Sequence, residues 1–308
     1  MKEALGFFVT SIVAIMLYKP LIKFFKKVEF GQYIREEGPD LHNYKTGTPT
    51  AGGVLFLLLP LIFAIFSHAS HLEWICVLSL LIFGGIGLAD DLISILRKNA
   101  TGLRTWQKMS LQVVGAVVLL YMLKSYTRQF VPIYGEEFNL GKWGYVLAIT
   151  ALVGASNAVN LTDGVDGLAG WNFLVSMGGL VVFSAIHSRP IPSTMLILMA
   201  TVLGFLWYNS HPAKLFMGDT GSLALGGVLA TYAIINGGLL YLPIFGLVFV
   251  VETLSVIIQV LSFKIRKKRV FLMSPLHHHF ELLQWPEEKI VARFVIVSLV
   301  ASMVALSM

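Results

Sequence analysis

The chain is a succession of apolar segments, most of them about 20 residues long, separated by short polar stretches. Ten such segments fall near residues 4–26, 51–69, 72–90, 107–124, 143–161, 168–188, 193–209, 222–236, 239–263 and 290–307. About 20 residues of α-helix, at a rise of 1.5 Å per residue, cross a hydrocarbon core of ~30 Å. We therefore predict an all-α, polytopic integral membrane protein with about ten transmembrane helices.

Two of these segments give a weaker signal than the others. Asn157 and Asn160 lie late in the fifth segment, and the eighth segment is short and rich in glycine. Buried polar side chains and glycine both weaken a membrane helix, so a shifted or broken helix is the alternative at these two positions.

Composition supports a membrane protein and excludes a soluble globular fold. The chain has 308 residues, of which 56% are hydrophobic and 13% are charged, whereas an average soluble domain has about 25% charged residues. The mean hydropathy is +0.77. Segments 27–50 and 264–289 are too short for a core of their own, so residues 1–308 are expected to form a single transmembrane domain. The one cysteine, Cys76, excludes an intrachain disulfide and a multi-cysteine metal site.

Basic residues are distributed unequally between the two predicted sides. With the N-terminus outside, eighteen Lys and Arg residues fall on the inner side, and the five on the outer side are Lys2, Lys124, Arg128, Lys142 and Arg189. Lys and Arg favour the cytoplasmic side of a membrane protein. Both termini are therefore expected to be extracytoplasmic. In a soluble protein the net charge of +6 could suggest nucleic-acid binding, but here the basic residues lie beside apolar segments and indicate membrane topology. No nucleic-acid partner is therefore expected.

Five of the six aspartates lie in short turns on the predicted cytoplasmic side, namely Asp90, Asp91, Asp163, Asp166 and Asp219. A single aspartate in such a turn most often caps a helix. Five on one face of a membrane favour a shared function. Mg²⁺ binds one or two carboxylates and completes its shell with water and substrate phosphates. Carboxylates gathered at this boundary of the membrane therefore suit a Mg²⁺ site on the cytoplasmic side.

Three motifs near these aspartates are candidates for phosphate binding. Segment 160–167 presents two carboxylates to one site, and its glycines permit close approach of a ligand. Segment 214–222 leads into the eighth apolar segment, where a helix N-terminus favours phosphate, although it can also be a simple cap. Segment 45–53 lacks the full phosphate-loop pattern. Lys45 and Thr50 are its candidate phosphate or nucleotide contacts, with a flexible entry to a helix as the alternative.

Polar residues of the last third of the chain add further candidates. His277, His278 and His279 are adjacent and have no cysteine partner, so a closed structural zinc site is not expected. Phosphate recognition, proton transfer and loop ordering stay open, as does a surface role. Glu252 and Gln259 lie seven residues apart inside the ninth segment, on nearly one helix face. An ionisable residue inside a membrane indicates a functional cavity or a hydrogen bond to a neighbouring helix.

Together these motifs resemble the phospho-N-acetylmuramoyl-pentapeptide transferase family, a branch of the polyprenyl-phosphate N-acetylhexosamine-1-phosphate transferases. The resemblance covers the whole chain through KTGTPTAGG, ADDLISI, NATGLRTWQK, NAVNLTDGVDGLAG, YNSHPAKLFMGDTGSLALGG and PLHHHFELLQWPEEKIVARF. The triple histidine and the Trp-Pro-Glu segment are similar to this branch in particular. The resemblance implies ten transmembrane helices, an active-site cleft on the cytoplasmic face, Mg²⁺ dependence and location in the bacterial cytoplasmic membrane. It further implies transfer of phospho-MurNAc-pentapeptide from UDP-MurNAc-pentapeptide to undecaprenyl phosphate, which yields lipid I and UMP.

The resemblance also implies residue roles. Asp219 is implied as the Mg²⁺ ligand, and Asp90 and Asp91 as the pair that engages the lipid phosphate, with Asp90 as the general base or attack-assisting carboxylate. The catalytic residues implied are Asp90, Asp91, Asp219 and His277. The substrate-binding residues implied are Lys45, Thr50, Lys108, Asn160, Asp163, Asp166, Asn209, Phe216, Ser222, Gln259, His278 and His279, with Phe216 at the uracil ring.

Some alternatives stay open at this level. Ser94 stands where many family members carry a lysine, so Lys108 and its basic neighbours are the candidate replacements. Displacement in one step and a phosphorylated carboxylate intermediate are both compatible with the motifs. The closest rival function is an N-acetylglucosamine-1-phosphate transferase that uses the same lipid carrier. A secondary transporter is a rival of another class, but its ion sites should lie near mid-membrane. A homodimer is expected from the resemblance alone.

Overall fold

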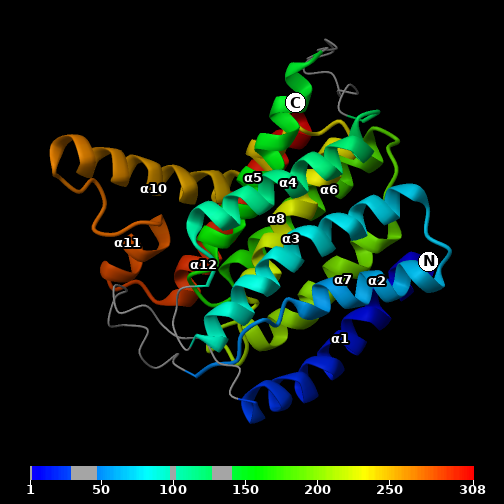
Figure 1. Cartoon of the computed structure of the whole chain (residues 1–308), viewed down its shortest axis with the longest axis horizontal. Coiled ribbons are helices and arrows are strands. Elements are labelled where there is room, and N and C mark those ends of the chain that lie inside the picture. Colours follow the sequence, from blue (N-terminus) through cyan, green and yellow to red (C-terminus); the bar gives the residue numbers. More distant parts are fainter. Residues whose placement is uncertain (1, 29–46, 98–101, 127–140) are drawn as a thin grey trace.

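The computed structural model describes residues 2–28, 47–97, 102–126 and 141–308 (Figure 1). The regular elements in these ranges are all helices. Their bounds are α1 (Lys2–Lys27), α2 (Val54–Phe66), α3 (His71–Leu96), α4 (Thr105–Leu123), α5 (Trp143–Thr162), α6 (Leu168–Ile186), α7 (Ser193–Asn209), α8 (Gly218–Ile235), α9 (Leu242–Phe245), α10 (Leu247–Arg266), α11 (Leu276–Leu282) and α12 (Glu287–Ser307). The all-α prediction is thus confirmed for the described residues.

Each of the ten predicted apolar segments contains a helix, but the ninth is not continuous. It is divided at Gly246 into the single turn of α9 and the long helix α10. Gly246 ends one helix and begins the next with φ −95° and ψ 28°, outside the helical range, which changes the direction of the chain. The fifth and eighth segments, where a break was the alternative, form the continuous helices α5 and α8.

Seven helices are long and apolar enough to cross a membrane, namely α1, α3, α4, α5, α6, α10 and α12. The apolar helices α2 and α7 are shorter, with 13 and 17 residues. Side chains such as Phe8, Val114 and Met303 are exposed on the outside of the bundle, as expected for surfaces that face lipid. The protein is therefore a multi-pass membrane protein, while the total of ten spans stays a prediction.

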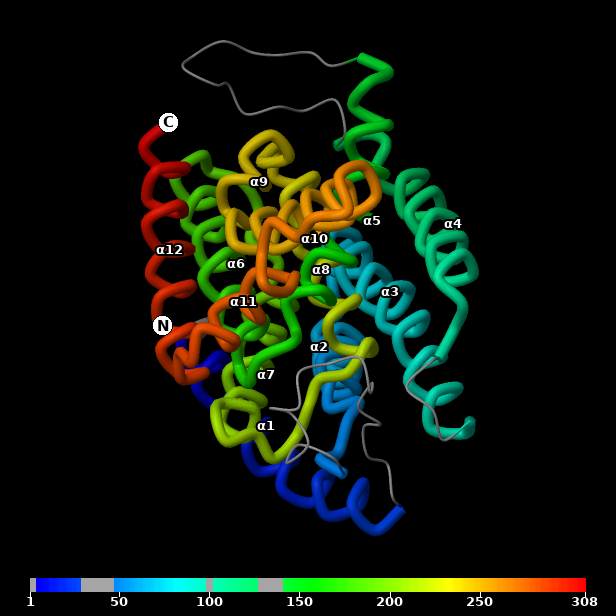
Figure 2. Tube along the Cα trace, turned by 90° about the vertical axis from the view of Figure 1, so that its left-hand side faces the viewer, coloured from blue at the N-terminus to red at the C-terminus, as the bar shows by residue number. Residues whose placement is uncertain are grey.

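Helix α8 is the centre of the bundle (Figure 2). It packs most extensively on α3 and α5, and every residue from Thr220 to Ile235 is buried. Glycines make this packing close. A Cβ added to Gly226 would meet the α5 backbone at Ala155 at 2.3 Å, and one added to Gly87 of α3 would lie 2.0 Å from the carbonyl oxygen of Asp219. Small residues at helix contacts let backbones approach in this way. They place the first turn of α8 directly against α3.

This packing predicts different effects for two glycines of α3. We expect Gly87→Ala to destabilise the protein by about 1–3 kcal/mol, because the new methyl group cannot fit against the α8 backbone. Gly85→Ala is the matched control, since a Cβ there meets nothing within 4 Å and Gly85 is exposed. Thermal unfolding in detergent should show a lower midpoint for Gly87→Ala and an unchanged or higher midpoint for Gly85→Ala. Equal midpoints would contradict the α3–α8 packing.

The C-terminal third adds a projecting unit to the bundle. Helix α10 extends away from the other helices, and α11 returns beneath it toward α12 (Figure 1). A small apolar cluster joins this unit to the turn before α6. Its buried members are Val165, Leu168, Val248, Ile290 and Phe294. The turn after α5 is therefore held between α10, α11 and α12.

Candidate functional site

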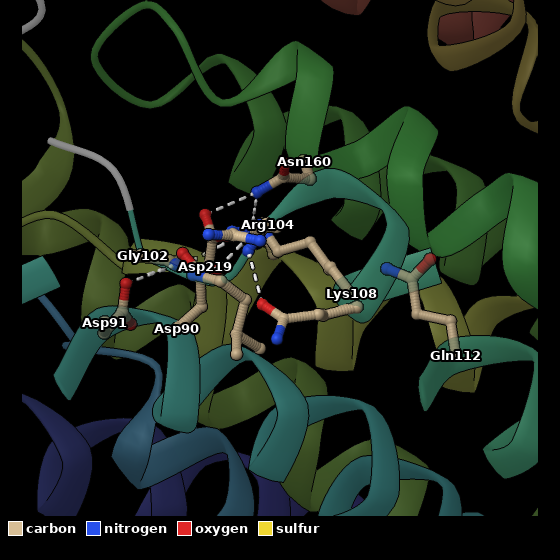
Figure 3. A network of polar contacts seen from close by, with 12 residues as sticks. Asp90, Asp91, Gly102, Arg104, Lys108, Gln112, Asn160 and Asp219 are labelled. Carbon is tan, nitrogen blue, oxygen red and sulfur yellow. Dashed lines mark hydrogen bonds and ion pairs between the residues drawn. The ribbon is translucent and has the colours of Figure 1, made fainter. Parts of the chain in front are cut away.

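A cluster of charged side chains surrounds Asp219 in the first turn of α8 (Figure 3). One carboxylate oxygen of Asp219 accepts a hydrogen bond from Nδ2 of Asn160 at 2.7 Å, and the other contacts Nζ of Lys108. Lys108 Nζ also lies 3.4 Å from Oδ1 of Asp90. Lys108 from α4 thus bridges two aspartates from α3 and α8, with Asn160 from α5 alongside. We call Asp90, Asp91, Lys108, Asn160 and Asp219 the aspartate centre.

Asp90 is held by the start of the next helix. Its Oδ1 accepts a hydrogen bond from the backbone N–H of Leu103 at 2.9 Å. Gly102 lies so close that a Cβ there would be 2.5 Å from Asp90 Oδ2. The side chains of Asp90, Lys108 and Asp219 are 13%, 19% and 23% exposed. These three groups are therefore partly accessible to a ligand.

Asp91 faces another partner, although it is adjacent to Asp90 in the sequence. Its Oδ1 accepts from the backbone N–H of Asp219 at 3.0 Å, and its Oδ2 accepts from the N–H and the hydroxyl of Thr220 at 3.0 and 2.6 Å. Asp91 is buried. It therefore caps the N-terminus of α8 from another helix and satisfies N–H groups that have no partner within α8.

Asp91→Ala is expected to cost roughly 2–3 kcal/mol of stability, because three hydrogen bonds to a buried carboxylate disappear. The measurement is again the unfolding midpoint in detergent. Asp90→Ala is the comparison, since the partly exposed carboxylate of Asp90 accepts one backbone hydrogen bond. A larger loss for Asp90→Ala than for Asp91→Ala would show that Asp91 is not the cap.

The segment before α2 is joined to the segment before α8 by backbone hydrogen bonds. The N–H of Phe216 donates to Pro49 at 2.8 Å, and the N–H groups of Gly52 and Gly53 donate to Phe216 and Met217 at 2.9 and 3.0 Å. Thr50 is buried in this junction, and a Cβ on Gly218 would lie 2.9 Å from its Oγ1. Two motifs that are far apart in the sequence therefore form one wall beside Asp219. Lys45, which was predicted to bind substrate, lies outside the described residues.

Further polar residues inside the bundle make hydrogen bonds next to the aspartate centre. Nδ2 of Asn160 also donates to Ser222 Oγ at 2.8 Å. One turn deeper, Gln112 and Asn157 exchange hydrogen bonds through their amides, the shorter at 2.6 Å. Gln112 was not predicted as a site residue, although a glutamine four residues after Lys108 in an apolar segment is a detectable signal. This pair links α4 to α5, the helices that carry Lys108 and Asn160.

Asp166 belongs to a second group. Its Oδ2 accepts from Ala213 N–H at 2.9 Å and lies 3.1 Å from His211 Nδ1. The N–H of Asp166 donates to Glu287 at 3.1 Å. Metal-ligating atoms of Asp166, His211 and Glu287 lie within 4.8 Å of one another, so these residues could hold a metal ion. His211 and Glu287 were not selected from the sequence, because their proximity depends on contacts between distant segments.

Asp163 directly follows α5, and Asn209 is the last residue of α7. Asp163 is the half-buried residue that ends α5. Asn209 is buried, accepts from Gly167 N–H at 3.1 Å and donates to the carbonyl of Leu215 at 2.9 Å. Its amide therefore ties the turn after α5 to the segment that leads into α8. A direct substrate contact by either residue stays a prediction.

The remaining predicted residues lie on the α10–α11 unit. Gln259 accepts from the N–H groups of Val270 and Phe271 and donates to Phe271, with distances of 2.9, 3.0 and 2.9 Å. His277 is fully buried against Glu252. His278 and His279 are half-buried, with Nδ1 of His278 2.5 Å from Glu281 and Nδ1 of His279 accepting from Leu272 at 3.2 Å.

The site residues predicted from the sequence thus do not all contact one another. The described residues place Asp90, Asp91, Lys108, Asn160, Asp219 and Ser222 together, with Thr50 and Phe216 in the adjoining wall. Asp166 and the three histidines make the contacts described above outside this group. The aspartate centre combines hard carboxylate oxygens, an ammonium group and a helix N-terminus, which suits bound Mg²⁺ and phosphate groups.

Comparison with known proteins gives a consistent result. Residues 73–237 match the model of glycosyl transferase family 4. The phospho-N-acetylmuramoyl-pentapeptide-transferase of Thermotoga petrophila is 48% identical over 296 residues, which are 96% of each chain. The enzyme of the same name from Kosmotoga olearia is 46% identical and covers 99% of this chain and 97% of its own. That from Lactiplantibacillus plantarum is 42% identical, with coverages of 96% and 95%.

Proposed function

The chain belongs to the phospho-N-acetylmuramoyl-pentapeptide-transferase family, within glycosyl transferase family 4, and from this premise we propose its reaction. It transfers phospho-MurNAc-pentapeptide from UDP-MurNAc-pentapeptide to undecaprenyl phosphate, with lipid I and UMP as products. This is the first membrane step of peptidoglycan synthesis. The assignment agrees with the function that the sequence motifs imply.

The observation that carries the site assignment is the meeting of Asp90, Lys108 and Asp219 at the N-terminus of α8. The reaction brings a lipid phosphate and a nucleotide diphosphate together, so several negative charges must be held close to one another. The positive end of a helix and the Lys108 ammonium favour these phosphates. The carboxylates would hold a divalent cation, which would offset the charge of the phosphates.

The donor set supports Mg²⁺ with Asp219 as its protein ligand. Asp219 offers a partly exposed carboxylate beside Asp90, and Mg²⁺ binds through one or two carboxylates together with water and phosphate oxygens. When bound, the ion neutralises phosphate charge and polarises the phosphoryl group that is transferred. The group of Asp166, His211 and Glu287 is a second set of possible metal ligands, with ligand atoms that lie within 4.8 Å of one another.

The chemical step is displacement at the β-phosphorus of the UDP donor. An oxygen of the lipid phosphate forms the new P–O bond, the bond to the bridging oxygen breaks, and UMP leaves with that oxygen. Asp90 orients the lipid phosphate and accepts its proton when that phosphate is singly protonated. Lys108 lies between Asp90 and Asp219 and offsets the negative charge of the phosphates. Asp91 contributes by holding Asp219 in place.

The nucleotide is placed along the wall formed by segments 49–53 and 216–217. Phe216 is half-buried there and offers an aromatic face to the uracil ring. Lys45, Thr50 and Ser222 are proposed as further contacts to the nucleotide or the diphosphate. Asn160, Asp163, Asp166, Asn209, Gln259, His278 and His279 complete the proposed substrate-binding set, and His277 is treated in the next subsection.

We propose a location in the bacterial cytoplasmic membrane with ten spans, both termini outside and the aspartate centre on the cytoplasmic side. The unequal distribution of Lys and Arg supports this orientation. It also places the aspartate centre where a soluble UDP donor can reach it. A homodimer is proposed from family membership.

The test of the donor is a comparison of UDP-MurNAc-pentapeptide with UDP-GlcNAc. Purified protein receives undecaprenyl phosphate, Mg²⁺ and one donor, and the lipid-linked product is identified by mass spectrometry. We expect lipid I from the first donor and at most a trace of product from the second. Preference for UDP-GlcNAc would assign the chain to the rival transferase activity, and turnover with neither donor would contradict both.

A further inference from the structure

Glu252 and His277 form a buried pair between α10 and α11. Both side chains have 0% exposure, and His277 Nδ1 lies 3.2 Å from Glu252 Oε2. The backbone N–H of His277 donates to Glu252 Oε1, also at 3.2 Å. One carboxylate therefore holds both the ring and the backbone of His277. Hydrogen bonding to a carboxylate places the Nδ1 proton toward Glu252 and leaves Nε2 as the opposite edge of the ring.

That opposite edge is pressed against the turn after α5. A Cβ on Gly164 would lie 2.2 Å from His277 Nε2 and 2.9 Å from its Cε1, so only glycine fits this position with the ring as it stands. Nε2 is buried and has no hydrogen-bond partner among the described residues. A buried ring nitrogen without a partner costs free energy, so contact with Gly164 has to be enforced by the other side of the ring. Glu252 is positioned to do this.

Gly164 lies between Asp163 and Asp166, so the position of the histidine ring determines where this turn can lie. Val165 and Leu168 pack on Val248 of α10 as well as on α12, which makes the turn, α10 and α12 one packed unit. The fully buried His277 ring has no open face for a substrate in this structure.

We propose that Glu252 is a positioning residue, which holds the His277 ring against Gly164 and so fixes the 163–167 turn for binding of the UDP donor. The proposal rests on the transferase function above. It also changes the interpretation of His277 from a group that touches substrate to a group that supports one wall of the site.

Glu252→Leu, Glu252→Gln and Gly164→Ala test this mechanism by steady-state kinetics. Leucine removes both acceptors, and we expect KM for the UDP donor to rise about tenfold or more, the loss expected for hydrogen bonds to a buried charged group. The amide oxygen of Gln can still accept from the backbone N–H of His277, and its NH2 group can donate to Nδ1 in the other ring tautomer, so Glu252→Gln should remain within about threefold of the parent protein. Gly164→Ala displaces the ring from its other side and should resemble Glu252→Leu. KM for the lipid phosphate should change little in all three.

Thr253→Val and Gly154→Ala are the matched controls. Among the described residues, the Thr253 hydroxyl donates within its own helix, to the carbonyl of Phe249 at 2.9 Å, and a Cβ on Gly154 of α5 would meet nothing within 4 Å. Both variants should keep the parent values of KM. Hydrogen exchange gives a readout that is independent of turnover. Amides of 163–168 should exchange faster in Glu252→Leu, while those of 219–225 in α8 stay protected.

The outcomes separate this proposal from the proposed function. An absence of lipid I from the parent protein contradicts the transferase assignment. If the parent protein is active and Glu252→Leu keeps its KM and its exchange pattern, the positioning role is overturned. It is also overturned if Glu252→Gln is as impaired as Glu252→Leu while both stay folded. If Glu252→Leu does not fold, Gly164→Ala still decides, because unchanged KM in that variant contradicts the proposal.

Discussion

Asp219→Asn is expected to lower the rate of lipid I formation by at least roughly 1,000-fold. Asparagine keeps the size of the side chain and can still accept a hydrogen bond from Asn160, but it removes the negative charge that would bind Mg²⁺ and pair with Lys108. Loss of several kcal/mol of charge stabilisation in the transition state corresponds to a rate loss of this size. The measurement is UMP release at saturating substrates over a series of Mg²⁺ concentrations.

Glu288→Gln is the control for this substitution, because Glu288 is 63% exposed and also loses one carboxylate charge. It should keep the parent rate. A near-parent rate for Asp219→Asn at high Mg²⁺ would remove Asp219 from the metal site and direct attention to Asp166, His211 and Glu287. Unfolding midpoints of both variants should match the parent protein, since the cap on α8 comes from Asp91.

Asp90→Asn is expected to lower turnover by at least roughly 100-fold while the UDP donor still binds. Its carboxylate is assigned to the lipid phosphate, so the loss should fall on kcat, as is usual when a general base is removed. The Oδ1 acceptor for Leu103 survives in asparagine, which keeps the start of α4 in place. The measurements are kcat and the dissociation constant of UDP-MurNAc-pentapeptide, by titration without lipid.

Lys108→Met provides the comparison for Asp90→Asn. It removes the charge that lies between both aspartates and should weaken donor binding as well as turnover. Asp90→Asn should change donor affinity by less than about threefold. If Asp90→Asn abolishes donor binding with the protein still folded, Asp90 belongs to the nucleotide half of the site and its assigned role is wrong.

Much of the fold could be predicted from hydrophobic segments alone. Each apolar segment contains a helix because backbone groups in a lipid environment must be satisfied within the segment. The break at Gly246 was not predicted, since the apolar pattern continues through it and a glycine in such a pattern is usually tolerated. Continuity of α5 and α8 was also uncertain from the sequence. Asn157 is accommodated in α5 by Gln112, a partner 45 residues away.

The aspartates were found because carboxylates gather on one predicted side, but their individual orientations were not predictable. Asp90 and Asp91 are neighbours in the sequence, yet Asp91 caps α8 through the backbone N–H of Asp219, which lies 128 residues after it. Close packing at Gly87 creates this contact, and no local pattern records it. The same holds for His277, whose burial depends on Glu252 and on Gly164. Residue types indicated the chemistry, and contacts between distant segments determined which groups act directly.

The most direct test of the account is release of UMP by the detergent-purified protein from UDP-MurNAc-pentapeptide, undecaprenyl phosphate and Mg²⁺. Parallel reactions omit the lipid, or contain EDTA in excess over Mg²⁺. We predict UMP release in the complete reaction, none without lipid, and none with EDTA until Mg²⁺ is restored. UMP release that is independent of lipid or of the metal, or no release by demonstrably folded protein, would contradict a Mg²⁺-dependent phosphoglycosyl transfer at the aspartate centre.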